Sequence, residues 1–326
     1  MKTNWFTYVT VLTSACYLMA CEDHRNSPNA PFPERINFIA ERQYPEGITY
    51  SSQLGKFLIT SITQGKIGTV DTDGRYMDLL SDHALISCNG IKVADDRILV
   101  CNNDQGASIK STPQTIRQTA ELVVFNLTTR QLERRIDLDA LLPAADPNFA
   151  NDLALAPDGT VYVTDSFSPV IYKVTPAGDA SILVRDDVRF SSPTFGLNGI
   201  VYHPNGYLIV ANTGQSKLYK VDLQNGNAVS EITGTGALPG DGLTLLNNDL
   251  YVVTGGGSRV AQVRSTDNWQ TASIVKTDEN GYFQATTNVA VNGRVYTLNA
   301  RIGEIGAAMG DQSKLQSRDY SIQQFR

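Results

Sequence analysis

Histidine is scarce in this chain of 326 residues, and its scarcity argues against one class of metal centre. The three histidines are His24, His83 and His203, and no two of them stand at a spacing suited to binding one ion. Zinc sites in proteins rely on His and Cys ligands. The chain holds only four cysteines, so the sequence does not favour a zinc enzyme.

Clusters of positive charge are also missing. The chain carries 27 Lys and Arg against 33 Asp and Glu, a formal net charge of −6. Its longest basic run is the pair Arg134-Arg135. A surface that follows a phosphate backbone needs clustered Lys and Arg, so nucleic acid is excluded as a partner.

Long apolar runs are absent except at the N-terminus, where Lys2 precedes an apolar stretch from Trp5 to Met19. About 15 apolar residues are fewer than the roughly 20 needed to span a bilayer, so the pattern is that of a signal peptide. Its end, Leu18-Met19-Ala20-Cys21, resembles the bacterial lipobox. We therefore expect lipidation at Cys21 and a cell-envelope location in which only the lipid touches the membrane. An ordinary secretory signal is the alternative.

Only Cys88 and Cys101 then remain in the folded part of the chain. Counting back from a turn at Asp95-Asp96 places them on one face of a hairpin as diagonal neighbours. Such a pair is near enough for a disulfide in an oxidising compartment. Bridging and simple packing both stay open.

Helical periodicity is missing throughout, and a short β-rich cassette recurs six times instead. Each copy opens with a polar residue, then a small or polar residue, then an aliphatic residue. The copies start 43, 62, 47, 43 and 46 residues apart. They open at Glu46-Gly47-Ile48, Asn89-Gly90-Ile91, Asn151-Asp152-Leu153, Asn198-Gly199-Ile200, Asp241-Gly242-Leu243 and Thr287-Asn288-Val289.

The third copy shows the content of one unit. A short alternating run, 153–155, is followed by a turn at 156–159 and by β-rich runs at 160–163, 170–174 and 180–184. Repeats of about 40 to 45 residues with four strands are typical of β-propellers. We predict an all-β, six-bladed β-propeller with four-stranded antiparallel blades.

A propeller must pair its last blade with the start of the chain or leave an edge exposed. Residues 36–41 form a spare strand, and the sixth unit ends at 320–325 without an outer strand. We therefore predict closure by the N-terminal strand. The chain then divides into a signal peptide (1–20), a tether (21–33) and one propeller domain (34–326). The 62-residue spacing places an insertion, 104–120, over one face of blade 2.

The first strand of every blade lines the central channel, so the six openings converge on one mouth. They carry Glu46, Asn89, Asn151, Asn198, Asp241 and Thr287. The ends of the second strands return to the same mouth with Ser61, Asn102, Asp165, Asn212, Thr254 and Asn299. Carboxylate and amide oxygens suit Ca²⁺, Mg²⁺ or Mn²⁺. The alternative is a channel that only binds ordered water.

These openings resemble the senescence-marker-protein, gluconolactonase and luciferin-regenerating-enzyme family of six-bladed propellers. The resemblance rests on Pro45-Glu46-Gly47-Ile48, Asn151-Asp152, Leu197-Asn198-Gly199-Ile200 and Gly240-Asp241-Gly242-Leu243. It implies that Glu46, Asn151, Asn198 and Asp241 hold one divalent cation, calcium in the first instance and magnesium or manganese otherwise. It also implies hydrolysis of a lactone or related ester as a small-molecule substrate, with Asp241 as the catalytic base or the nucleophile.

Two departures from the family narrow this expectation. Sugar-lactone members often place an Arg two residues before the Asn-Asp pair, and this chain has Phe149 there. The His dyad of paraoxonase-type relatives is absent as well. We expect Phe149, Asn89, Asp165, Asn212 and Thr287 to contact the substrate or to support the ligands, in a monomeric protein. The rival hypothesis is a noncatalytic, envelope-anchored propeller that binds a protein, glycan or small ligand through its insertion.

Overall fold

The computed structural model describes Met1 and residues 32–326. The signal peptide, almost all of the tether and Cys21 lie outside the described residues. Residues 33–326 form one compact unit. Within the described part, no helix is long and apolar enough to cross a membrane.

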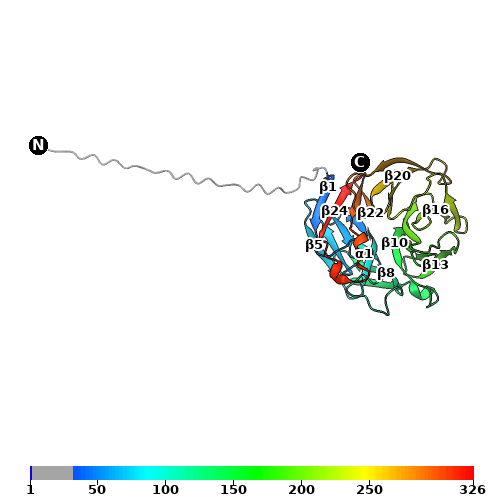
Figure 1. Cartoon of the computed structure of the whole chain (residues 1–326), viewed down its shortest axis with the longest axis horizontal. Coiled ribbons are helices and arrows are strands. Elements are labelled where there is room, and N and C mark those ends of the chain that lie inside the picture. Colours follow the sequence, from blue (N-terminus) through cyan, green and yellow to red (C-terminus); the bar gives the residue numbers. More distant parts are fainter. Residues whose placement is uncertain (2–31) are drawn as a thin grey trace. The chain divides into compact units, whose positions relative to one another are not determined.

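The strands of this unit form six sheets, each of four antiparallel strands. Figure 1 shows the sheets arranged as blades around a common centre. This confirms the predicted six-bladed β-propeller. Blade 1 contains β2 (Ile48–Ser51), β3 (Lys56–Thr60), β4 (Lys66–Val70) and β5 (Tyr76–Ser81); blade 2, β6 (Ser87–Ala94), β7 (Arg97–Asn103), β8 (Ala120–Asn126) and β9 (Leu132–Asp137); blade 3, β10 (Ala150–Leu155), β11 (Val161–Asp165), β12 (Val170–Val174) and β13 (Ala180–Arg185); blade 4, β14 (Leu197–His203), β15 (Tyr207–Asn212), β16 (Lys217–Asp222) and β17 (Ala228–Ile232); blade 5, β18 (Leu243–Leu246), β19 (Asp249–Thr254), β20 (Arg259–Arg264) and β21 (Ser273–Asp278); blade 6, β22 (Ala285–Val291), β23 (Arg294–Asn299), β24 (Asp319–Gln324) and β1 (Arg35–Ile39).

Burial decreases from the inner to the outer strands of a blade, and the hydrophobicity of the strand sequences decreases in the same direction. Every residue of β11 is buried, whereas β13 in the same blade has none that is fully buried. Strands covered on both faces are hydrophobic along their length. The cores lie between blades: one cluster joins Leu99 of blade 2 to Val163 and Tyr172 of blade 3. Among residues 32–326, helical structure is limited to η1 (Asp139–Leu141), α1 (Gly303–Ala308) and η2 (Gln312–Lys314).

The N-terminal strand closes the ring, as predicted. β1 pairs antiparallel with β24, with Ile36 opposite Ile322 and Phe38 opposite Tyr320. Figure 1 shows β1 in blue beside β24 in red. Because β1 is the outer strand of blade 6, the two ends of the propeller are held in one sheet and the last blade is complete.

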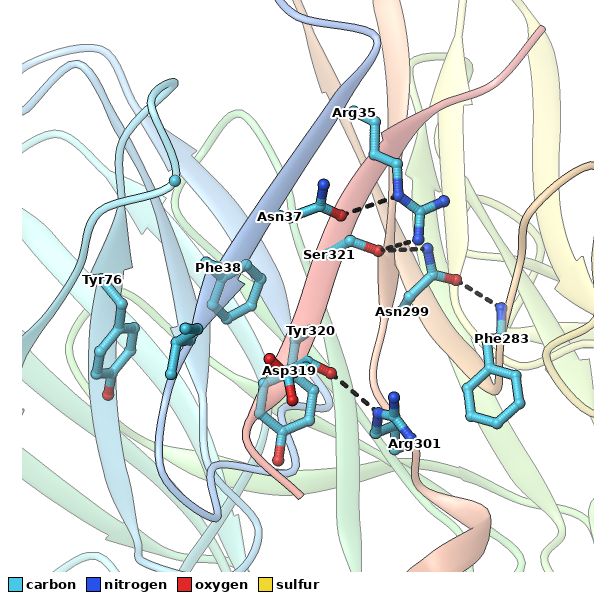
Figure 2. Close-up of a pocket in the computed structure, with 12 residues that line it drawn as sticks. Arg35, Asn37, Phe38, Tyr76, Phe283, Asn299, Arg301, Asp319, Tyr320 and Ser321 are labelled. Carbon is cyan, nitrogen blue, oxygen red and sulfur yellow. Dashed lines mark hydrogen bonds between the residues drawn. The ribbon is translucent and has the colours of Figure 1, made fainter.

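A cavity of about 690 Å³ lies beside this closure, and Figure 2 shows its polar side chains directed at one another. The Arg35 guanidinium donates to Gln323 Oε1 at 2.6 Å and to Ser321 Oγ at 2.9 Å. Asn299 Nδ2 also donates to Ser321 Oγ, at 3.0 Å. The polar groups here are occupied in fastening the N-terminal strand to blade 6, so the cavity is a consequence of closure.

The first strand of four blades contains a β-bulge at the cassette opening. The pairing register shifts between Cys88 and Ile91, and at the equivalent places in blades 3, 4 and 6. A bulge adds one residue to a strand and redirects the side chains around it. In these four blades the redirected residues are those that open the cassette. The sequence pattern had predicted regular strand geometry at these positions.

The bulge in blade 2 overturns the expected placement of the two cysteines. Cys88 pairs with Asn102, so the Cys101 side chain points to the opposite face of the blade. Cys88 packs in the core between blades 1 and 2, and Cys101 in the core between blades 2 and 3. Both thiols are free and buried. They are therefore not the diagonal neighbours expected from the turn, because the extra residue reverses the alternation between them.

Candidate metal and active site

A cavity of about 560 Å³ opens at one mouth of the central channel. Five of the six cassette openings line it: Glu46, Asn89, Asn151, Asn198 and Asp241. Phe149 lines it as well. We call these five residues of the ring the floor of the cavity. They lie together there although each is more than 40 residues from the next along the chain.

Thr287, the sixth opening, does not line the cavity. Its side chain packs against Gly242 of the preceding blade instead, and a Cβ on Gly242 would come within 2.1 Å of Thr287 Oγ1. The same close approach recurs at Gly199, where a Cβ would lie 2.3 Å from the Asp241 carbonyl oxygen. The glycine of the cassette therefore lets each first strand touch the next, which keeps the ring narrow.

Three amide side chains of the ring are hydrogen-bonded to residues at the ends of the second strands. In each case the partner is the residue that follows the one expected from the sequence. Asn89 Oδ1 accepts from Asn103 at 3.0 Å, Asn151 donates to Ser166 Oγ at 2.8 Å, and Asn198 donates to Thr213 Oγ1 at 3.1 Å. Asn103, Ser166 and Thr213 were not expected from the sequence. A β-bulge in the first strand shifts the pairing by one residue, so the hydrogen-bond partner on the second strand also moves by one residue.

Asp165 and Asn212, expected to contact the substrate or to support the ligands, do not line the cavity. Asp165 accepts hydrogen bonds from the backbone N–H of Phe149, at 3.1 Å, and from the Tyr172 hydroxyl, at 3.0 Å. Asn212 donates to the Arg189 carbonyl oxygen at 3.0 Å. Both side chains fasten the chain segment that leads into a first strand, so they position the ring from behind.

Three carboxyl groups lie close together at the channel: Glu46 and Asp152 are buried, and Asp241 is partly buried. Burial, and then the nearby Asp241 and Asp152, raise the pKa of Glu46 well above its usual range. Burial raises the pKa of Asp241 to about 7, aided by Asp152 and opposed by a hydrogen bond from Asn198. Burial also raises the pKa of Asp152, while Lys92 lowers it. Without a cation, the ring therefore resists carrying its full negative charge.

The donor set of the floor fits a divalent cation of the calcium type. Asn151 Oδ1 is buried and accepts no hydrogen bond, and a buried oxygen in that state costs free energy unless something binds it. Within residues 32–326, no group of three or more His, Cys, Asp or Glu side chains is placed to hold a metal ion. A metal here would need amide oxygens beside Glu46 and Asp241, a mixture that suits Ca²⁺ better than Zn²⁺.

Two long connections roof the cavity. The expected insertion, the β7–β8 connection, contributes Gln105, Gly106 and Ala107. The second of the two connections lies between β23 and β24 and carries α1 and η2. It was not expected from the sequence. Gln312 of η2 donates to the Ala107 carbonyl oxygen at 2.5 Å and joins the two.

The fold and site define the class of this protein: a six-bladed propeller with carboxylate and amide oxygens at its channel mouth. A family model described as the SMP-30/Gluconolactonase/LRE-like region matches residues 44–268. This span is more than half of the chain, and the chain belongs to that family. Membership supports a lactonase-type hydrolase in general. No curated protein sequence matches the chain.

Solved structures share the fold at low sequence identity. The major allergen Mala s 1 of Malassezia sympodialis has a TM-score of 0.69 at 17% identity, covering 90% of this chain and 96% of the allergen. Regucalcin of Agrobacterium tumefaciens, a calcium-binding protein, has a TM-score of 0.59 at 17% identity, covering 90% and 94%. A gluconolactonase of Xanthomonas campestris has a TM-score of 0.59 at 15% identity, covering 89% of each chain. At these identities the likeness establishes the fold alone.

Proposed function

We propose that this chain is a divalent-metal-dependent hydrolase of a lactone or related ester. The observation that carries the proposal is the convergence of Glu46, Asn151, Asn198 and Asp241 on the floor of one cavity. The unpartnered, buried Asn151 Oδ1 among them supports a cation as the missing partner. The calcium-binding regucalcin and the gluconolactonase among the similar structures are consistent with this reading.

Glu46, Asn151, Asn198 and Asp241 would hold the ion. A bound divalent cation supplies polarisation of the ester carbonyl and stabilisation of the developing oxyanion. Hydrolysis adds water to the carbonyl carbon and breaks the acyl C–O bond. The proton leaves the water and returns to the departing alkoxide, giving a hydroxy acid from a lactone.

Asp241 is the group best suited to carry that proton. A carboxylate beside the ion can accept the proton of the attacking water and release it to the departing alkoxide. Asn198 donates to its carboxylate and restrains its orientation. The roof over the cavity limits the access of bulk water to the reacting ester.

A panel of lactones and aryl esters, assayed with calcium and with a chelator, tests the proposal. We expect turnover of at least one substrate, loss of turnover in chelator, and its return when calcium is added back. Acid release followed with a pH indicator measures all three. A domain that binds calcium yet turns over no lactone or ester would favour the binding-protein hypothesis, and a domain that binds no divalent cation would contradict the proposal.

We propose further that the chain is exported and anchored by a lipid on Cys21. The support is the lipobox-like sequence alone, since Cys21 lies outside the described residues. Cys21→Ser should abolish incorporation of labelled palmitate and move the protein from the membrane fraction to the soluble fraction. Cys16→Ser, five residues earlier in the same segment, is the matched control and should change neither. Equal labelling of both variants would contradict the assignment.

A further inference from the structure

We propose that the substrate carries an apolar substituent, an alkyl chain or an aromatic ring, which the wall and roof of the channel-mouth cavity enclose. This inference rests on the proposed function and names its substrate class. It excludes polyhydroxylated sugar lactones and anionic esters as preferred substrates. The division of the cavity into a polar floor and an apolar upper part carries the argument.

The upper part of the cavity is built mainly from large apolar side chains, with Gln105 and Gln312 as its polar side chains. Phe149 and Phe195 form the wall, and their rings meet edge to face with centroids 5.7 Å apart. The roof segment, 301–318, adds Ile302, Ile305, Met309 and Leu315 to the lining. Met309 is 89% exposed and Phe195 is 37% exposed in the ligand-free chain. Apolar surface left open beside buried carboxylates is what a partly apolar ligand would cover.

Positive charge is absent from the lining. Among the described residues, no Lys or Arg side chain lines this cavity, whose charged groups are Glu46 and Asp241. Arg117 lies over the ring of Phe167, 4.1 Å from its centroid, and is outside the lining. A substrate with a carboxylate or phosphate would have no cation to pair with except the one on the floor.

The roof is fixed in place by the blade that supplies Glu46. Tyr44, two residues before Glu46, donates its hydroxyl proton to Glu304 Oε2 at 2.7 Å and accepts from the Ser317 N–H at 3.1 Å. Its ring packs with Ala308 and Leu315. The apolar roof is therefore tied to the same chain segment as the floor, and its position over the ring is part of the fold.

Burial in such a space favours hydrocarbon and disfavours hydroxyl groups. Each methylene transferred from water gains about a fourfold factor in binding. Each sugar hydroxyl placed against the apolar roof without a partner loses affinity. The volume of about 560 Å³ lies within the range of ordinary small-molecule sites and leaves room for a substituent beyond the ester ring.

The test is a series of γ-lactones with ring substituents from methyl to hexyl, beside glucono-δ-lactone, hydrolysed by the calcium-loaded chain. We expect kcat/KM to rise roughly three- to fourfold per methylene until the cavity is filled. The hexyl lactone should exceed glucono-δ-lactone by at least about a hundredfold. Equal or faster hydrolysis of the methyl lactone or the sugar lactone, compared with the hexyl lactone, would overturn the inference while leaving the proposed hydrolase intact.

A matched pair of variants locates the effect. Met309→Gln places an amide in the apolar roof and should reduce the preference for hexyl over methyl lactone by about three- to tenfold. Met77→Gln makes the same change on β5, where Met77 is 54% exposed and outside the cavity, and should leave the preference unchanged. An identical loss in both variants would show that the roof does not contact the substituent.

Binding of nonhydrolysable γ-lactams separates the two proposals. If hexyl lactam binds more tightly than methyl lactam and Met309→Gln reduces that difference by about three- to tenfold, the apolar site stands whether or not any ester is turned over. If lactones are hydrolysed but lactam affinity is independent of chain length, the hydrolase stands and the substrate class is wrong. Calorimetric titration of the calcium-loaded protein supplies the affinities.

Discussion

Asp241→Asn should abolish lactone hydrolysis, lowering kcat/KM by at least about 10²–10⁴-fold, while the propeller remains folded. The substitution removes the group proposed to carry the proton and one of the two carboxylates on the floor. The side chain keeps its shape, so the hydrogen bond with Asn198 can be re-formed with an amide. Activity with the best substrate of the panel and unfolding temperature are the two measurements.

Asp241→Asn should not destabilise the cation-free domain, unlike most substitutions of a hydrogen-bonded side chain. Burial raises the pKa of Asp241 to about 7, so in the cation-free protein its ionised form, which predominates above that pH, lowers the free energy of unfolding. Replacing it with a neutral amide should leave the cation-free domain as stable as before or more stable at pH 8. Loss of activity would then arise from chemistry, not from unfolding.

Asp249→Asn is the matched control in the same blade. Asp249 accepts from the Arg264 guanidinium at 2.6 Å and from Gln262 at 2.6 Å, on a strand end away from the cavity. Its replacement should lower the unfolding temperature and leave kcat/KM unchanged. Full activity in Asp241→Asn, or loss of activity in Asp249→Asn, would contradict the assignment of Asp241.

The fold could be predicted because propeller blades repeat their own local signals. The unit opening at Asn151 predicted strands at 170–174 and 180–184, and the structure has β12 at Val170–Val174 and β13 at Ala180–Arg185. Closure followed from counting strands, since an outer strand was missing at one end of the chain and spare at the other. These inferences need only sequence periodicity and the cost of an open sheet edge.

Side-chain direction at the site could not be obtained from the same pattern. A β-bulge at the cassette opening changes the register by one residue, so the partners of Asn89 and Asn151 are Asn103 and Ser166 instead of Asn102 and Asp165. The same shift places Cys88 and Cys101 on opposite faces. Strict alternation holds along a regular strand and fails at a bulge.

The roof was missed for a different reason. Its helix, α1, is six residues long and lies among Gly303, Gly306 and Gly310, so it has no amphipathic stripe to find. Its position depends on contacts with distant segments, above all Tyr44 with Glu304 and Gln312 with Ala107. Such contacts follow from closing the ring and from no local feature of residues 301–318.

The buried carboxyl groups also set how stability depends on pH. Glu46 and Asp241 have raised pKa values in the folded, cation-free chain, so the folded state binds their protons more tightly than the unfolded state does. Their protonated forms stabilise the fold below the unfolded pKa of about 4. The contribution of Asp241 is lost as pH rises through about 7, and that of Glu46 as pH rises through its own raised pKa. For Asp241 alone, the loss is on the order of 4 kcal/mol.

A bound cation reverses this dependence, because it binds the ionised carboxylates and competes with their protons. Calcium at about 100 times its Kd adds about 2.7 kcal/mol of stability, or roughly 4–5 °C in Tm for a domain of this size. We expect that difference between calcium and chelator at pH 8 and almost none at pH 5, measured by calorimetric scans at both pH values. Asp241→Asn should remove the shift at pH 8. If calcium raised Tm equally at pH 5 and pH 8, the ion would bind away from Glu46 and Asp241. That result would contradict the proposal that the channel mouth is the metal site.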